Sequence, residues 1–517
     1  MGPVRMITEH SLQPERPKYR LLAYFALNAG FIVLALILQG IGGSDNPRLL
    51  HVILLFAVCS TSITDLDGLN GKYALLAMFL AFYFVSFGLG DFNNLVAGFS
   101  SEKTPSYFSE TEAVILSGAV MFALAYRLAV YIASPTLQTP MQRDWSTSTA
   151  LIVGLTLWLV GTIQLFWWNV YLFPDSSQEA SQRGLASLSP IAIAANLLAG
   201  LLQPVGILLI AYIWRARRAN FLLPFLVAIV ILQIVLGFVV NIKSLAMIAG
   251  ILIIVAYIFI DGRLPKGWLA AAAVFAVIGF PVFQASRFEI HGNRHIARTT
   301  ILENLGQVLE LAVAAENRAY KGPERAQTLL ERTSVRGSIQ MIVERTGNDV
   351  PFQHGHTLAP VLVTFIPRIL WADKFGVSTG LLVNKEFKLS DSPDVYISPS
   401  IPGELYWNFG WPGVLLGMTA IAGAVGVIGC RFNLSRSKTV TGLLVVVLTI
   451  KQVIVAMEGS FSPEYVVWLR SLGAVGVLHL LFARVRVGAQ TIAVDAQPQN
   501  AKVESSPGVK AFPNLLH

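Results

Sequence analysis

The chain has 517 residues, of which 54% are hydrophobic and only 13% charged, and its mean hydropathy is +0.61. A soluble protein of this length does not carry so apolar a composition, which excludes a soluble enzyme and predicts an all-α polytopic membrane protein. The formal net charge of +8 would suit a nucleic-acid partner. Much of it, however, lies at the ends of apolar segments, where cytoplasmic loops of membrane proteins retain Lys and Arg.

Apolar windows of about 20 residues follow one another along the chain, each long enough to cross a bilayer as a helix. They do not alternate with period two, as the strands of a membrane barrel would. The first window follows a polar stretch without a cleavage site and is therefore interpreted as a retained span. The pattern predicts twelve spans: Leu21–Gly40, Leu49–Ile63, Tyr73–Gly90, Ala113–Ala133, Ala150–Leu172, Leu188–Ile213, Phe221–Val240, Ser244–Ile260, Gly267–Gln284, Trp411–Cys430, Thr439–Met457 and Glu464–Ala483.

The domain boundaries follow from these spans. We expect a cytoplasmic tail over residues 1–20, spans one to nine over 21–284, a periplasmic loop over 285–403, the last three spans over 404–486, and a disordered cytoplasmic tail over 487–517. Only two cysteines occur, Cys59 and Cys430, both in or at the end of apolar segments. They imply no disulfide or metal framework.

Lys and Arg near the ends of the spans predict the orientation, because cytoplasmic loops retain them. The short loops of one face carry only Arg48, Lys103, Arg183 and Lys243. The other face carries sixteen: Arg5, Arg16, Lys18, Arg20, Lys72, Arg143, Arg215, Arg217, Arg218, Arg263, Lys266, Arg431, Arg436, Lys438, Arg484 and Arg486. Both termini are therefore expected in the cytoplasm, and the positive charge needs no nucleic acid.

The segment Phe283–Asn408 is the longest stretch of mixed polarity, and it is rich in Lys and Arg. Apolar residues at helical spacing predict an amphipathic helix over Thr299–Glu316. A second helix is expected from about Glu324 to Thr346, before a Gly-Asn stop. Arg336 would lie at its apolar border, either facing a ligand or pairing with Glu331 or Gln340 on a solvated face.

The end of this segment changes character. Leu358–Trp371 is apolar but too short to span and contains two prolines, so it is expected in the interface or as a re-entrant piece that carries Arg368 at membrane depth. Further prolines then predict an extended strap before Glu404 opens a short helix, which Gly410 and Pro412 break.

These motifs resemble those of a known family. The run Phe365-Ile366-Pro367-Arg368 before Asp373-Lys374, and the sequence Pro402-Gly403-Glu404-Leu405-Tyr406-Trp407-Asn408-Phe409-Gly410-Trp411-Pro412-Gly413, resemble the oligosaccharide repeat-unit polymerases of the Wzy type. Many spans with one large late external loop resemble them too. Asn241-Ile242-Lys243-Ser244 has lysine where family members often carry arginine. The related O-antigen ligases usually have a His-Asn pair where this chain has Trp407-Asn408.

The resemblance implies a GT-C-like glycosyltransferase of the bacterial inner membrane, without a metal or cofactor. Its substrate would be an undecaprenyl pyrophosphate-linked oligosaccharide, and its partners a flippase and a chain-length regulator. Developing charge on the pyrophosphate needs cations, and the acceptor hydroxyl needs a base. The residues expected in catalysis are Glu404, Arg336 and Arg368; those expected to bind substrate are Arg287, Lys243, Tyr406, Asn408, Lys451 and Arg470.

Lys451 and Arg470 belong to this set because charges inside spans are costly and usually functional. Both are expected about 9 Å below the outer boundary, facing one outward cavity together with Arg287 and Lys243. Glu458, seven residues after Lys451, is a possible partner of the lysine. Snorkelling to the headgroups is the alternative explanation for both cations.

Other interpretations stay open. Arg287 and Arg368 could anchor at the headgroups, Glu404 could serve only as a first-turn charge, and the aromatic residues could form an interfacial belt. An O-antigen ligase is the nearest alternative function. A secondary transporter has a similar number of spans, but the loop Thr64–Lys72 lacks the motif of major-facilitator transporters, and the late external loop fits that class poorly. A structural assembly partner would not need intramembrane cations.

Overall fold

The structure, a computed structural model, describes residues 17–42, 49–65, 68–89, 109–137, 143–168, 190–240, 243–275, 335–363, 378–389, 395–436 and 438–485, with single residues or pairs at 279, 282–283, between 301 and 314, and at 366 and 371. Its elements in chain order are α1 (Pro17–Gly42), α2 (Leu49–Ser60), α3 (Ser62–Asp65), α4 (Ala74–Phe87), α6 (Glu110–Leu137), β1 (Arg143–Trp145), α7 (Thr147–Phe166), α9 (Pro190–Ala216), η2 (Asn220–Leu222), α10 (Leu223–Val240), α11 (Lys243–Asp261), α12 (Lys266–Val274), α17 (Arg336–Arg345), α18 (Ala359–Leu362), α19 (Thr379–Phe387), α20 (Ser400–Arg431), α21 (Val440–Glu458), α22 (Phe461–Phe482) and β2 (Ala483–Val485).

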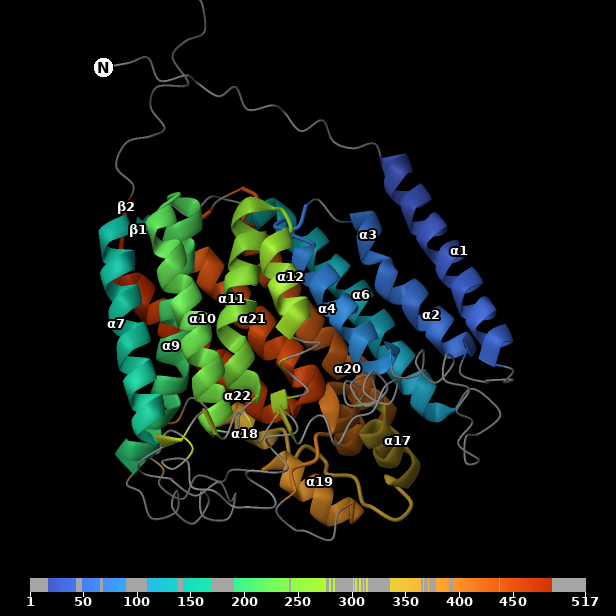
Figure 1. Cartoon of the computed structure of the whole chain (residues 1–517). Coiled ribbons are helices and arrows are strands. Elements are labelled where there is room, and N and C mark those ends of the chain that lie inside the picture. The colour runs from blue at the N-terminus through green and yellow to red at the C-terminus, as the bar shows by residue number, and fades with distance from the viewer. Residues whose placement is uncertain are drawn as a thin grey trace, which may run out of the picture.

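The long helices run side by side as one bundle (Figure 1). The short helices α17, α18 and α19 lie together at one end, which we call the α17 end, and the strands β1 and β2 lie at the other, the ribbon end. A helix occupies all or part of each predicted span. Within the described chain, six helices are long and apolar enough to cross a membrane: Arg20–Ile37, Glu110–Ser134, Thr147–Phe166, Asn220–Val240, Ser400–Arg431 and Phe461–Phe482. A membrane protein built from helices is thus confirmed.

Small residues allow neighbouring helices to approach closely. α7 packs along α9, and a Cβ added at Gly206 would clash with the backbone of Trp158 and Gly154. α6 packs along α20 in the same way, since a Cβ at Gly426 would lie 3.0 Å from the carbonyl oxygen of Tyr126. Apolar burial cannot drive helices together inside a bilayer, so such close backbone contact and van der Waals packing must hold the bundle.

A two-stranded antiparallel ribbon at the ribbon end was not expected. β1 pairs with β2 in the register Asp144↔Arg484, which joins segments far apart in the sequence. The Asp144 side chain also accepts a hydrogen bond from the backbone N–H of Val440 (3.0 Å) at the start of α21. The ribbon ties the end of α22 to the loop before α7, so the last helix stops at Phe482.

In the mixed-polarity segment over residues 283–408, the described residues agree with the predicted helical pattern. Ile301 is buried against Phe238 and Ala246, whereas Glu303 and Glu310 are exposed, as an amphipathic helix requires. The second helix is seen only as α17. It starts at Arg336 and ends at Arg345; Thr346 is extended, and Gly347 follows with a left-handed φ of +86°. The expected part of this helix from Glu324 to Ser334 lies outside the described residues.

The break in the tenth span is confirmed. Residues 395–399 form neither helix nor strand, and Pro399 has helical φ and ψ angles rather than the expected extended ones; α20 then begins at Ser400, four residues earlier than expected. Inside α20, Gly410 has φ 62° and ψ −144°, which divides it into two helices, and Pro412 follows. Glycine adopts this backbone conformation readily because glycine has no Cβ.

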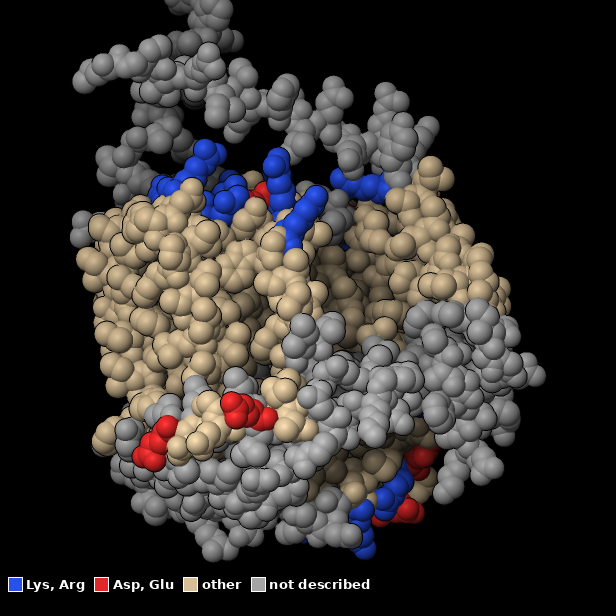
Figure 2. Space-filling view, viewed as in Figure 1, with Lys and Arg blue, Asp and Glu red and all other residues tan. Residues whose placement is uncertain are grey.

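Charge is distributed unevenly over the surface. On the face drawn in Figure 2, Lys and Arg gather along the ribbon end, a broad band without charge covers the middle of the bundle, and charged residues of both signs reappear at the α17 end. A band of this kind is the surface that a bilayer would cover.

Candidate functional site

The break at Gly410 opens the backbone of α20 toward a neighbouring loop. In an unbroken helix the carbonyl of Asn408 would accept from residue 412, but a proline there has no N–H. The backbone N–H of His354 donates to that carbonyl instead (3.1 Å), and Gln353 N–H donates to the carbonyl of Trp407 (2.9 Å). The loop after α17 is therefore fastened to the broken helix through main-chain groups.

The side chain of Asn408 completes this fastening. Its Oδ1 accepts from the backbone N–H of Gly355 (2.9 Å), and its Nδ2 donates to Thr357 Oγ1 and to the carbonyl of Glu404, both at 2.7 Å. Asn408 is fully buried, and both ends of its amide are occupied. The structure thus gives Asn408 a positioning role within the fold, whereas the sequence predicted a contact with substrate.

Glu404 lies one turn earlier in α20 and is also fully buried. Its Oε2 accepts from the backbone N–H of Ser462 (3.4 Å) in the first turn of α22, where the helix dipole favours a negative charge. Its Oε1 has no hydrogen-bond partner among the described residues. A general base must reach the hydroxyl that it deprotonates. Glu404 is fully buried and does not line the cavities beside Lys451, Trp468 and His479.

The strap over residues 395–399 brings one more titratable group near Glu404. Tyr396 is half exposed, but its hydroxyl lies inside and shares a hydrogen bond with Ser460 Oγ (2.7 Å). Burial raises the pKa of Tyr396; the hydrogen bond with Ser460 opposes this shift, and the negative charges of Glu404 and Glu464 add to it. Tyr396 therefore stays neutral and serves as a hydrogen-bonding group.

An accessible carboxylate lies on the neighbouring helix. Glu110, the first residue of α6, is exposed at the α17 end. One of its oxygens, Oε1, accepts from the hydroxyl of Tyr406 (2.7 Å) and from the indole Nε1 of Trp411 (2.9 Å). These two aromatic residues lie on either side of the break in α20. The carboxylate is thus held in one orientation while its second oxygen, for which no contact appears among the described residues, can meet a ligand.

Arg336 is held by a second carboxylate of the same turn. Its guanidinium forms a buried ion pair with Glu112, and it also donates to Gln340 Oε1 (3.3 Å). Glu112 in turn accepts from the backbone N–H of Ser109 (3.0 Å) and from its hydroxyl. Arg336 is only 6% exposed, so the structure joins α17 to α6 through it, where the sequence predicted a cation facing substrate.

The expected cavity shared by Lys451 and Arg470 is not found. Lys451 lines a cavity between α9, α21 and α22, but Arg470 is exposed on α22 and is not among the lining residues. The carboxylate that lies near Lys451 is that of Glu464, on the next helix. The side chain of Glu458, the partner considered from the sequence, lies outside the described residues. Helix rotation, which spacing along one chain cannot predict, separates the two cations.

Three other predicted residues cannot be placed. Arg287 and Arg368 lie outside the described residues, and Lys243 is described only as the first residue of α11, without its side chain. In the part of the chain that the structure covers, no three His, Cys, Asp or Glu side chains gather as metal ligands would.

Glu110 and Glu112 were not predicted as site residues, although the sequence around them has a recognisable motif. Ser109-Glu110-Thr111-Glu112 is a capping box, in which the N-cap serine and the glutamate three residues later satisfy the start of a helix. The predicted span began at Ala113 and so left the acidic turn out. Comparison with protein-family models, with characterised proteins and with solved structures finds no match to this chain, so the assignment rests on the site itself.

Proposed function

We propose that the chain is a membrane glycosyltransferase that extends a surface polysaccharide from undecaprenyl pyrophosphate-linked oligosaccharide, as polymerases of the Wzy type do. The observation that carries the proposal is the Glu110 carboxylate, which Tyr406 and Trp411 hold at an exposed position. A fixed carboxylate beside aromatic residues suits a sugar, since the acid binds or deprotonates a hydroxyl and aromatic faces pack on the ring.

In this proposal Glu110, rather than the buried Glu404, orients the acceptor and takes its proton. The acceptor hydroxyl oxygen forms a bond to the anomeric carbon of the donor glycan. The bond from that carbon to the pyrophosphate oxygen breaks, and the pyrophosphate leaves with the bonding electrons. Cations must stabilise the leaving group, and Arg287 and Arg368 of the external segment keep that predicted role.

The location of the site agrees with the sidedness that the sequence predicts. If all twelve predicted spans cross, the ribbon end with its Lys and Arg faces the cytoplasm of a bacterial inner membrane, and the α17 end faces the periplasm. Lipid-linked glycan would then meet Glu110 outside the cytoplasm. A flippase would supply this substrate, and a chain-length regulator would act on its product.

The Glu110→Gln variant tests the proposal. A glutamine keeps an oxygen that accepts from Tyr406 and Trp411 but cannot take a proton, so the fold should persist while chain growth falls by about a hundredfold or more. Variants are expressed in a strain lacking the gene, surface glycan is resolved on a gel, and protein in the membrane is quantified. Glu344→Gln, an exposed carboxylate on α17, is the matched control and should give a normal ladder.

The same gel distinguishes the alternatives. Single capped repeats in the deletion strain indicate a polymerase, uncapped lipid core indicates a ligase, and an unchanged ladder excludes both. Glu404 would be the general base if, at equal protein amounts, Glu110→Gln gives a normal ladder and Glu404→Gln loses it. Normal ladders from both variants would refute the proposed site.

A further inference from the structure

A cavity of about 180 Å³ lies between α9, α21 and α22, away from the Glu110 site. Its wall is apolar along Leu201, Pro204, Leu448 and Val467. Its polar groups are Lys451, Gln452 and Ser471. The space is large enough for several water molecules and suits one small headgroup.

Lys451 gives this cavity a positive charge that its described protein neighbours balance only indirectly. With its amide oriented to satisfy both neighbours, Gln452 accepts from Lys451 Nζ (3.2 Å) and donates to Glu464 Oε2 (2.7 Å). Among the described side chains, no carboxylate oxygen lies within ion-pair distance of Lys451. An ammonium group on an apolar wall is costly unless an anion compensates it, so the cavity attracts an anionic ligand.

The cavity is open at the perimeter of the bundle. Gly200 on α9 is exposed, and a Cβ built on it would meet nothing within 4 Å. Pro204 lies one turn later inside the same helix and has no N–H, so the helix offers no donor at that position to the carbonyl of Gly200. A ligand entering past Gly200 would come from the bilayer and would meet a backbone acceptor at the entrance.

The cavity does not lead to Glu404. Beyond Gln452, the space between Ile401, Phe461 and Trp468 has no room for a water molecule, and Glu404 lines neither space. Lys451 lies seven residues, about 10 Å along the helix, before the end of α21 at the α17 end, a distance that its long side chain shortens. The ligand at Lys451 is therefore neither the donor nor the acceptor of the proposed reaction.

We propose that this cavity binds a phospholipid of the bilayer, with the anionic phosphate at Lys451 and the first apolar carbons along Leu201, Pro204 and Val467. The inference goes beyond the proposed function, because it holds whatever reaction the chain catalyses. Such a lipid would fill the space between three helices and neutralise Lys451, and in this way it would join α9 to the pair α21 and α22.

Native mass spectrometry of the full-length protein in detergent tests the proposal. The protein is stripped of lipid and then incubated separately with phosphatidylglycerol, phosphatidylcholine and a polyprenyl phosphate. The wild type should retain phosphatidylglycerol most strongly. Lys451→Met should weaken that retention about tenfold, the magnitude expected for a hydrogen bond to a charged group. Arg470→Met removes an exposed cation of the neighbouring span and should retain lipid as the wild type does.

Gly200→Leu is a second, independent variant, because it blocks the cavity from α9 and leaves the charge of Lys451 in place. It should weaken retention as much as Lys451→Met does, so the test survives if the lysine variant fails to fold. Undiminished phosphatidylglycerol retention by Gly200→Leu overturns the proposal. Equal retention of phosphatidylcholine also overturns it. A preference for the polyprenyl phosphate overturns it as well, because the cavity would then belong to the donor lipid.

Discussion

The two ends of the bundle both join helices through arginine–carboxylate pairs, but they do so in different surroundings. At the ribbon end, Arg127 pairs with Asp65 and Arg215 with Asp261, and the side chains are 19–30% exposed. At the α17 end, the side chains of Arg336 and Glu112 are only 8% and 3% exposed. Charge is partly hydrated in the first case and almost completely desolvated in the second.

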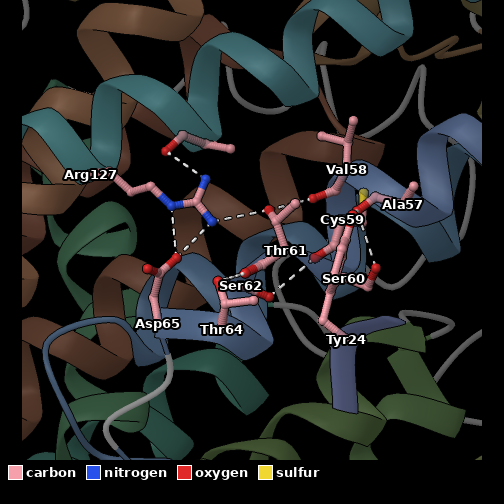
Figure 3. Close-up of polar contacts among 11 residues, drawn as sticks. Tyr24, Ala57, Val58, Cys59, Ser60, Thr61, Ser62, Thr64, Asp65 and Arg127 are labelled. Atoms are coloured by element: carbon pink, nitrogen blue, oxygen red, sulfur yellow. Dashed lines mark hydrogen bonds and ion pairs between the residues drawn. The ribbon is translucent and has the colours of Figure 1, made fainter. Parts of the chain in front are cut away.

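The ribbon-end pairs are also supported by hydroxyl and backbone groups. Arg127 extends from α6 to the interruption between α2 and α3, where it contacts Asp65 and donates to Thr61 Oγ1 (3.0 Å) (Figure 3). Thr61 and Thr64 each donate to a carbonyl three residues earlier, both at 2.7 Å. The dashed contacts in Figure 3 join α6 to the α2–α3 region, so we interpret this cluster as a structural anchor.

The α17 end differs because its carboxylates are not all used. Both oxygens of Glu112 are occupied by Ser109 and Arg336, whereas the contacts of Glu110 with described residues all go to its Oε1, and Glu404 is enclosed within the fold. Of these two, only Glu110 is exposed. Paired charges therefore hold the helices together at both ends. A carboxylate that is fixed in orientation but not neutralised, such as Glu110, is the better candidate for a reactive group.

Removing one partner of the buried pair should have the largest effect on stability. Glu112→Ala leaves the guanidinium of Arg336 buried without its carboxylate, and we expect a loss of about 3–5 kcal/mol in the free energy of unfolding. Denaturant unfolding in detergent, followed by tryptophan fluorescence, measures it. The double variant Glu112→Leu with Arg336→Met should recover most of the loss, because no lone charge remains. A double variant as unstable as the single one would contradict the importance of the unpaired charge.

Breaking the fastening at Gly410 should have an intermediate effect. Asn408→Ala leaves the N–H of Gly355 without its acceptor in a largely buried place, and we expect a loss of about 2 kcal/mol. The control is Asn348→Ala, since Asn348 is exposed and its side-chain Nδ2 donates to the carbonyl of Glu344 (3.0 Å). It should change stability by no more than about 0.5 kcal/mol. Equal effects at the two positions would show that the loop over α20 is not held by Asn408.

Breaking a pair at the ribbon end should have the smallest effect. Asp261→Asn removes the negative charge that pairs with Arg215. Because both side chains are partly hydrated, we expect the free energy of unfolding to fall by about 1 kcal/mol or less, and by less still as salt is added. The same unfolding experiment at low and high salt measures it. If the loss matches that of Glu112→Ala and does not respond to salt, the contrast between the two ends is wrong.

The sequence by itself determined the elements that depend on local chemistry. Hydropathy predicted where the helices lie, because a bilayer demands about 20 apolar residues per span. Gly410 and Pro412 predicted the break in α20, and Gly347 predicted the end of α17, because allowed φ values and the missing proline N–H act within a few residues. The amphipathic pattern likewise predicted that Ile301 is buried and Glu303 exposed.

Only the tertiary structure decided which charged groups meet. Arg336 pairs with a carboxylate 224 residues earlier, Tyr406 donates to one 296 residues earlier, and Lys451 lies near Glu464 of the next helix. Such pairings depend on how each helix is rotated about its axis and on which helices become neighbours. Hydropathy contains little of that information, because lipid and protein interior are almost equally apolar. An apolar composition therefore identifies the spans but does not specify which helices pack together. The packing of the bundle decides that, and with it the composition of the site.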